Sequence, residues 1–280
     1  PSQGFEKGAM ATIQLTQALR KEYETLFNTC VVRPQAAAEV QRIVDSVTSN
    51  ARPYQDVADT IGIPWFFIAA IHSMESSLNF KAHLHNGDPL TARTVHEPRG
   101  RPTTGKPPFT WQESAMDALA HKGLGSETDW SLSGTLYQLE RYNGFGYRLY
   151  HPHVLSPYLW CGSNHYTSGK YVKDGVWSDT AVSRQCGAAV LLRRMAELGR
   201  IEFADQAVTT GAGDTPPLVC PYTSTKSEDP VMVGRARDLQ NWLNTYPGIF
   251  LKVDGIPGAR TSEAYRAVTG HYLPGDPRRT

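Results

Sequence analysis

The stretch from residue 63 to residue 80, IPWFFIAAIHSMESSLNF, places one carboxylate, Glu75, at the end of an otherwise apolar segment. Pro64 suits the first helical position, and apolar residues cover nearly every side, which predicts a buried central helix. Glu75 lies on one stripe with Phe67 and Ile71, at spacings of four. Because a carboxyl group at the rim of such a stripe loses hydration in its charged form, we expect its pKa to be raised, as a general acid requires.

The composition is that of a globular protein with one sizeable domain and a smaller one. Of the 280 residues, 40% are hydrophobic and 20% are charged, and the formal net charge is +1. A charge near zero without a long block of Lys and Arg argues against nucleic-acid binding. The longest apolar run, residues 61 to 71, is too short to span a bilayer, so we expect no membrane insertion.

We expect synthesis in the cytoplasm without a signal peptide, because no basic leader is followed by an apolar segment and a cleavage site. The first nine residues, PSQGFEKGA, are interpreted as a cloning-derived tail, with Met10 as the native start. The four cysteines are widely spaced and form no CxxC pair, which favours free thiols over a disulfide framework or a zinc ribbon. We expect no cofactor.

The chain is predicted to be mainly α-helical, with one small β-hairpin after the central helix. Asn86 to Pro89 form a turn signal, and the β-branched residues of segment 90–95 follow it. The segment from 156 to 177 is rich in turn residues and is interpreted as an insertion loop. Helices are expected over residues 11–29, 35–49, 51–62, 110–122 (capped by Thr110), 133–142 and 180–198.

A second, smaller domain is predicted at the C-terminus. Thr, Gly, Pro and Ser accumulate between residues 203 and 230, which is typical of a linker. A helix is expected over 233–243, then a turn, then a helix capped by Thr261. We therefore predict a catalytic domain over 10–205, a linker over 206–230 and a small domain over 231–280.

Two short motifs carry a resemblance to a known superfamily. Residues 75–80, Glu-Ser-Ser-Leu-Asn-Phe, resemble the ESSxNP-type signature of soluble lytic transglycosylases and goose-type lysozymes. Tyr142-Asn143-Gly144 is similar to a Tyr-Asn-Ala-Gly motif that lines the same cleft. The resemblance to the lysozyme-like superfamily covers roughly residues 55 to 160. It implies a lysozyme-like α domain in which Glu75 is the catalytic acid and Tyr142 and Asn143 line the cleft.

The C-terminal segment carries an independent resemblance. Leu239, Gln240, Leu243 and Asn244, followed by an Asp-Gly-xx-Gly-xx-Thr pattern over 254–261, look like the small three-helix peptidoglycan-binding domain. The resemblance implies a domain that holds the enzyme on the bacterial cell wall.

Glycoside cleavage commonly uses a second carboxylate beside the acid. Asp88, in the predicted hairpin turn 13 residues after Glu75, is the first candidate, and Glu97 is the reserve. A separation of about 5 Å between the carboxyls would favour retention, and about 6.5 to 9.5 Å would favour inversion. Without a second carboxylate, attack by the sugar's own hydroxyl, the lytic transglycosylase route, is the alternative.

The full prediction is a peptidoglycan-degrading glycosidase, a lysozyme or a lytic transglycosylase, that acts as a monomer on the glycan strands of the cell wall. A phage endolysin released by a holin and a delivered effector fit equally well. The rival hypotheses are a zinc amidase or endopeptidase using His83, His85 and Asp88, and a non-catalytic wall-binding protein. The residues expected to contact substrate are Ser76, His85, Thr94, Tyr142, Asn143 and Tyr158.

Overall fold

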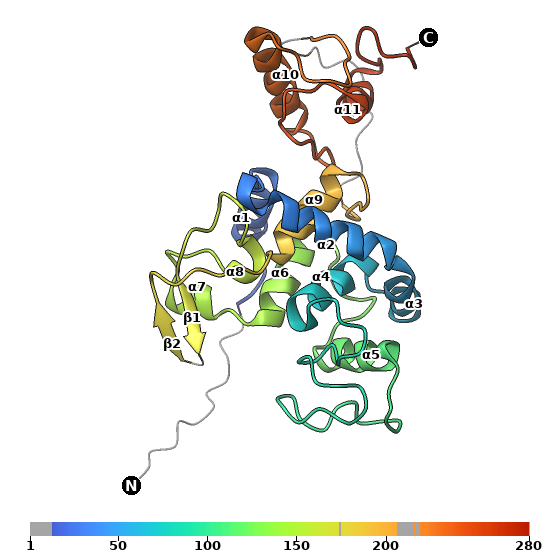
Figure 1. Ribbon diagram of the computed structural model, residues 1–280, viewed down its shortest axis with the longest axis vertical. Coiled ribbons are helices and arrows are strands. Elements are labelled where there is room, and N and C mark those ends of the chain that lie inside the picture. Colours follow the sequence, from blue (N-terminus) through green and yellow to red (C-terminus); the bar gives the residue numbers. More distant parts are fainter. Residues whose placement is uncertain (1–12, 174, 206–215, 217–218, 280) are drawn as a thin grey trace.

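A computed structural model describes residues 13–173, 175–205, 216 and 219–279. The described chain is mainly helical, with eleven α-helices, one 3₁₀-helix and a two-stranded antiparallel sheet, as the predicted fold class requires at this coarse level. Figure 1 shows a large lobe and a small C-terminal lobe, coloured orange to red, stacked at one end of it. The proposed start at Met10 lies outside the described residues.

The helices of the large lobe follow the predicted periodicity closely up to residue 143. Thr110 and Glu113 form the predicted N-terminal cap of the fifth helix as a reciprocal capping box. The helices of this lobe are α1 (Gln17–Asn28), η1 (Pro34–Ala36), α2 (Ala37–Ser49), α3 (Ala51–Ile61), α4 (Trp65–Ser76), α5 (Trp111–His121), α6 (Leu132–Asn143), α7 (Gly146–Tyr150), α8 (Pro157–Trp160) and α9 (Ala188–Glu197).

Helix α4 is the buried centre of the large lobe. It packs against α3, α6 and α9, and its residues from Phe66 to Ser73 are all buried. The helix stops because Ser77 and Leu78 adopt left-handed backbone conformations, with φ of 52° and 61°. The Ser77 N–H then closes the last turn on the carbonyl of His72. This ending leaves Glu75 in the final turn, where the helix meets the surface.

The prediction of a β-hairpin after α4 is wrong. Residues 81–109 form a looped segment with one isolated bridge, between Ala82 and Pro89. The backbone N–H groups of Val95 and His96 donate to the side chain of Asp88, so they are not available to a strand ladder. The carboxylate therefore organises this segment in place of strand pairing.

The sheet lies instead in the segment expected to be an insertion loop. Strands β1 (Lys170–Lys173) and β2 (Val176–Ser178) pair antiparallel there, and the short helix α8 precedes them. Helix α9 begins at Ala188, eight residues later than predicted. Gly187 lies so close to Leu159 that a Cβ would come within 2.3 Å of its carbonyl oxygen, and Gln185 just before it bonds to the end of α4.

The small lobe contains α10 (Pro230–Leu243) and α11 (Ala259–Thr269) and has its own hydrophobic cluster. A third helix is not among its described residues. Thr261 does not cap α11, because Gly258 occupies the N-cap position and Thr261 lies buried in the first turn beside the amide of Gln240. Part of the predicted linker, residues 206–215 and 217–218, lies outside the described residues, whereas Cys220 is packed into the core of the small lobe.

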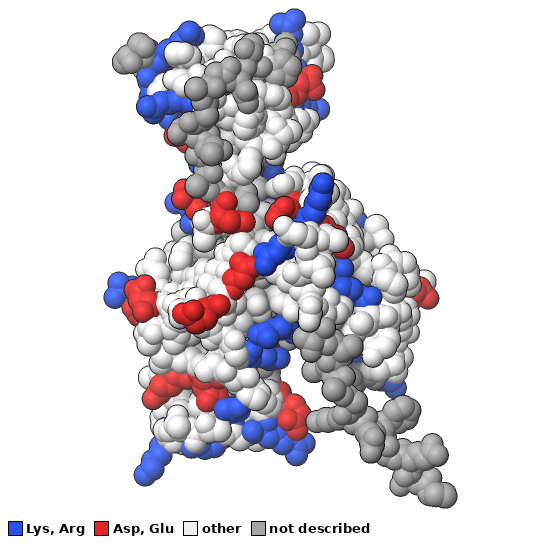
Figure 2. All heavy atoms as spheres, turned by 180° about the vertical axis from the view of Figure 1, so that it is seen from behind, with Lys and Arg blue, Asp and Glu red and all other residues white. Residues whose placement is uncertain are grey.

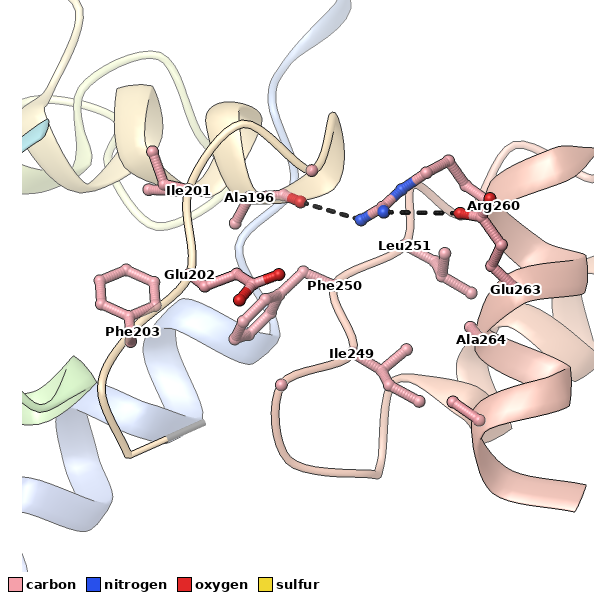
Figure 3. A pocket seen from close by; sticks show the side chains of 13 residues that line it. Ala196, Ile201, Glu202, Phe203, Ile249, Phe250, Leu251, Arg260, Glu263 and Ala264 are labelled. Atoms are coloured by element: carbon pink, nitrogen blue, oxygen red, sulfur yellow. Dashed lines mark hydrogen bonds and ion pairs between the residues drawn. The ribbon is translucent and has the colours of Figure 1, made fainter. Parts of the chain in front are cut away.

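The two lobes are joined by packing as well as by the chain. Phe250 of the small lobe is buried against Phe27 of α1, with ring centroids 5.3 Å apart, and belongs to the core of the large lobe. Arg193 of α9, 2% exposed, donates to the carbonyls of Phe27 and Leu251 at 2.9 and 3.2 Å. Figure 3 shows Arg260 reaching from α11 to the carbonyl of Ala196 beside an interlobe cavity of about 350 Å³.

The surface of the protein carries charges of both signs. On the face shown in Figure 2, acidic and basic side chains are interspersed over both lobes. Among the described residues, no single helix is long and apolar enough to cross a bilayer; α3 and α4 reach that length and composition only together, across a bend of 120°. The four cysteines are unpaired and buried.

The interlobe packing predicts that Phe250→Ala destabilises the whole protein. Removing a ring buried between the lobes should lower the free energy of unfolding by about 3 to 5 kcal/mol. Thermal unfolding followed by circular dichroism measures the loss, and Val231→Ala on the exposed face of α10 is the control, with an expected change within about 0.5 kcal/mol. An unchanged melting temperature for Phe250→Ala would contradict a stabilising role of this interlobe contact.

A second prediction concerns the buried His72 of α4. Its Nδ1 lies 2.8 Å from the Tyr54 hydroxyl, and its ring packs against Phe80 and Trp111. Burial lowers the pKa of His72 from 6.5 to about 4. Because the folded state resists protonation, stability should be complete above about pH 6.5 and fall as the pH drops to 4, by about 3 kcal/mol in total. Urea unfolding at several pH values should show this slope, and His72→Gln should flatten it; an equal slope in both proteins would contradict the assignment.

Candidate active site

Glu75 lies in the last turn of α4, partly exposed, with its carboxylate held by a buried phenol. The Tyr158 hydroxyl of α8 donates to Oε1 at 2.9 Å. Tyr158 is only 9% exposed, and Pro157 starts its short helix. Gln185 fixes the same helix end, because its side-chain amide donates to the carbonyls of Ser73 and Met74 at 3.2 and 2.8 Å. The acid is thus placed by segments more than 80 residues apart.

Burial and two neighbouring groups determine the ionisation of Glu75. Burial raises its pKa, while the hydrogen bond from Tyr158 and the positive charge of Lys122 act in the opposite direction, and the net shift is upward. Burial together with the negative charge of Glu75 also raises the pKa of Tyr158 well above its usual value. Tyr158 therefore remains a protonated donor, and Glu75 holds its proton to a higher pH than an exposed glutamate.

Lys122 is a member of this site that sequence reasoning missed. It is the C-cap of α5, with its amine 3.2 Å from the carbonyl oxygen of Tyr142 and 4.6 Å from the centre of the Tyr142 ring. Tyr142 is buried in the last turn of α6, and the negative charge of Glu75 adds to burial in raising its pKa. No motif surrounds Lys122 in the sequence, so only the hydrogen bonds between the ends of α5 and α6 in the folded protein reveal it.

The predicted residues on α4 and α6 differ in their exposure. Ser76, next to Glu75, donates back to the carbonyl of His72 at 3.4 Å. Asn143 is exposed and ends α6, with Gly144 after it at a φ of 92°. Of the predicted contact residues, the structure thus brings Tyr142 and Tyr158 to Glu75 and leaves Asn143 free to reach solvent.

Asp88 is near the end of α4 but is held by its own loop. The preceding turn lies against the helix, since a Cβ on Gly87 would be 3.3 Å from the carbonyl oxygen of Glu75. The Asp88 carboxylate accepts backbone N–H bonds from Val95 and His96 at 2.8 and 3.0 Å and pairs with the His96 ring at 2.6 Å. Burial alone would raise its pKa, but these hydrogen bonds outweigh burial and lower it to about 2. Asp88 is therefore an ionised carboxylate whose oxygens are engaged within the protein.

The other two predicted loop residues also have local partners. Glu97 is exposed and lies 3.5 Å from Arg99 in an ion pair. Thr94 is buried, donates to the carbonyl of Pro98 and accepts the N–H of Arg101 at 2.9 Å. In the described structure, neither Asp88 nor Glu97 is among the groups that shift the pKa of Glu75.

His83 and His85, which the zinc-enzyme hypothesis requires as metal ligands, are buried and bound to protein groups. His83 lies 2.8 Å from both the Ser114 hydroxyl and the Ala92 carbonyl. His85 bonds to Asp117 at 2.8 Å, and burial lowers its pKa despite that partner. No three His, Cys, Asp or Glu side chains within the described ranges are grouped so that they could hold a metal ion.

Chemically, the site offers one carboxyl group that can carry a proton, a phenol that orients it and an ammonium group nearby. Such a group can protonate a leaving oxygen, provided that substrate reaches the exposed edge of Glu75. Comparison with protein-family models, with curated proteins and with solved structures finds no match to this chain.

The raised pKa of Glu75 predicts that Glu75→Gln stabilises the protein at neutral pH. The folded state disfavours the ionised carboxylate, so wild-type stability should decline as the pH rises from the unfolded pKa through the higher folded pKa. The glutamine variant lacks this decline. Its melting temperature should exceed that of the wild type at pH 7.5 and equal it near pH 4. Glu97→Gln, at an exposed position, is the matched control; a lower melting temperature for Glu75→Gln at pH 7.5 would contradict the prediction.

Proposed function

We propose that this protein cleaves the glycan strand of peptidoglycan, with Glu75 as the general acid. The observation that carries the proposal is the carboxyl group of Glu75 itself, whose pKa is raised by burial while Tyr158 holds it at 2.9 Å. Breaking a glycosidic bond requires a proton on the leaving oxygen, and a carboxyl group with a raised pKa is suited to supply it. The ESS and YNG motifs that suggest a lysozyme-like domain meet at this point, since Tyr142 and Glu75 are electrostatically coupled.

The proposed reaction begins with Glu75 protonated and its exposed edge against the glycosidic oxygen. Tyr158 fixes the orientation of the carboxyl group, and proton transfer to the leaving sugar leaves Glu75 ionised. The nearby Lys122 ammonium and the Tyr158 hydroxyl stabilise that ionised state. In the second half of the reaction the same carboxylate accepts a proton from the attacking hydroxyl.

The attacking group distinguishes a lysozyme from a lytic transglycosylase. The loop hydrogen bonds that hold Asp88 and the exposed position of Glu97 favour a mechanism in which Glu75 is the one catalytic carboxylate. Attack by a hydroxyl of the substrate sugar fits that arrangement, and hydrolysis assisted by Asp88 is the competing route.

The small lobe is proposed to hold the enzyme on the cell wall, as its resemblance to peptidoglycan-binding domains implies. Its shared pattern has structural roles here: the Gln240 side chain bonds to Asp254 at 2.9 Å and accepts the N–H of Gly255 at 2.9 Å. These contacts fix the turn before α11. Placed at one end of the large lobe, a wall-binding lobe would keep the site close to an insoluble substrate.

The function predicts that Glu75→Gln folds but loses cleavage of purified peptidoglycan. Loss of the transferable proton should reduce the rate of muropeptide release by about 10² to 10⁴ or more. Release of soluble fragments, followed by mass spectrometry, measures it. Glu97→Gln should retain the wild-type rate, and a Glu75→Gln variant with full activity would disprove the proposal.

The products and one further variant separate the two routes. Anhydro sugars identify transglycosylation, and reducing-end sugars identify hydrolysis. If Glu75 acts alone, Asp88→Asn should lower the melting temperature through its loop and change the turnover far less than Glu75→Gln. Reducing-end products together with an Asp88→Asn loss as large as that of Glu75→Gln would establish the two-carboxylate route instead.

A further inference from the structure

Two cations lie together where the ends of α5 and α6 meet, and the proposed chemistry uses them only through the effect of the Lys122 charge on Glu75. Lys122 caps α5, and Arg141 occupies the last turn of α6. The Arg141 guanidinium donates to the carbonyl of Lys122 at 2.7 Å, and the Lys122 amine donates to the carbonyl of Tyr142 at 3.2 Å. A backbone carbonyl at the end of each helix thus accepts a hydrogen bond from the cationic side chain of the other helix.

The pair is unusual because its members repel each other. The charge of Arg141 contributes to a lowered pKa of Lys122, after burial of the lysine stem, and the charge of Glu75 acts against both. Among the described residues, Lys122 and Arg141 donate to backbone carbonyls and neither is ion-paired to a carboxylate. Two neighbouring cations without a direct ion pair favour binding of an anion from outside.

The Lys122 side chain has the geometry for such a contact. Its stem packs on the Tyr142 ring, with the amine 4.6 Å from the ring centre, while the residue as a whole remains exposed. One N–H of the amine is used on Tyr142, which leaves two donors for a ligand. A carboxylate is planar and can accept from an ammonium and a guanidinium together.

We propose that Lys122 and Arg141 form a carboxylate-binding subsite next to Glu75, which selects glycan strands that carry an acidic substituent beside the scissile bond. The inference rests on the proposed function and specifies its substrate. In peptidoglycan the carboxylate belongs either to the lactyl ether of a peptide-free muramyl residue or to the peptide attached to it. Neutral strands of N-acetylglucosamine lack it.

The test is a binding measurement in the Glu75→Gln background, so that the strand is not consumed. The probes are peptide-free glycan strands with free lactyl carboxylates and the same strands after methyl esterification, titrated by calorimetry. The free-acid strand should bind about five to ten times more tightly than the ester, as expected for a partly exposed charge-assisted contact. Adding Lys122→Met should abolish this preference, and Lys122→Arg should keep most of it.

Lys106→Met, at an exposed loop lysine, is the matched control and should leave the preference intact. Arg141→Met provides a second variant that probes the same subsite from α6, and circular dichroism confirms folding of each protein. Equal affinity for acid and ester in both peptide-free and peptide-bearing strands, or a preference that survives both Lys122→Met and Arg141→Met, would overturn the proposal. Peptide-bearing strands distinguish the two sources of the carboxylate: a preference seen only with them assigns the subsite to the peptide.

Cleavage by the wild-type protein separates this inference from the proposed function. If the wild type releases fragments from both acid and ester strands and the binding measurement gives equal affinities for them, the subsite is rejected and the glycosidase proposal stands. Failure of the wild type to cut any strand, despite selective binding of the acid form, would reject the glycosidase and keep the carboxylate site.

Discussion

The burial of helix α4 is the constraint on which the rest of the structure depends. The helix packs against α3, α6 and α9 and is buried from Phe66 to Ser73, so apart from Trp65 at its start it meets solvent at its last turn. An acidic residue placed there is partly dehydrated, and its charge is costly unless other groups compensate. Tyr158 and Lys122 supply partial compensation from two different elements. The catalytic proposal follows from this balance, because complete compensation would leave Glu75 ionised and unable to donate a proton.

Glu75 and Asp88 show how environment separates two carboxylates that lie 13 residues apart. Asp88 accepts several hydrogen bonds from its own loop and its pKa falls, whereas Glu75 accepts one from Tyr158 and its pKa rises. The protein thereby has an anion that shapes the loop and an acid that can carry a proton. The apolar surroundings of Glu75 in the sequence predict its raised pKa, whereas the lowered pKa of Asp88 depends on the N–H groups that it receives from its folded loop.

Local sequence patterns predicted the parts of the fold that are determined locally. The apolar run of α4, the Thr110 capping box and the helices before residue 143 need only periodicity and capping. The predictions that are wrong concern segments whose structure depends on contacts that periodicity and capping do not describe. Asp88 takes the N–H groups of the expected hairpin, and close packing of Gly187 against Leu159 delays the start of α9. In the candidate site, Glu75 was predictable from its apolar surroundings, but Lys122 and the Tyr158 hydrogen bond depend on segments that meet only in the folded protein.

The docking of Phe250 into the core of the large lobe restricts how the protein could work on a solid surface. A lobe on a loose tether lets an enzyme sample every bond within the reach of its linker. Here Arg193 and Phe250 fix the small lobe to α1 and α9, so an anchored molecule would present its acid at one distance and one angle. Such an enzyme would cut at intervals set by its own dimensions and would have to detach and rebind to reach the next bond. The spacing of its cuts along a strand would then be a measure of the rigidity of the protein.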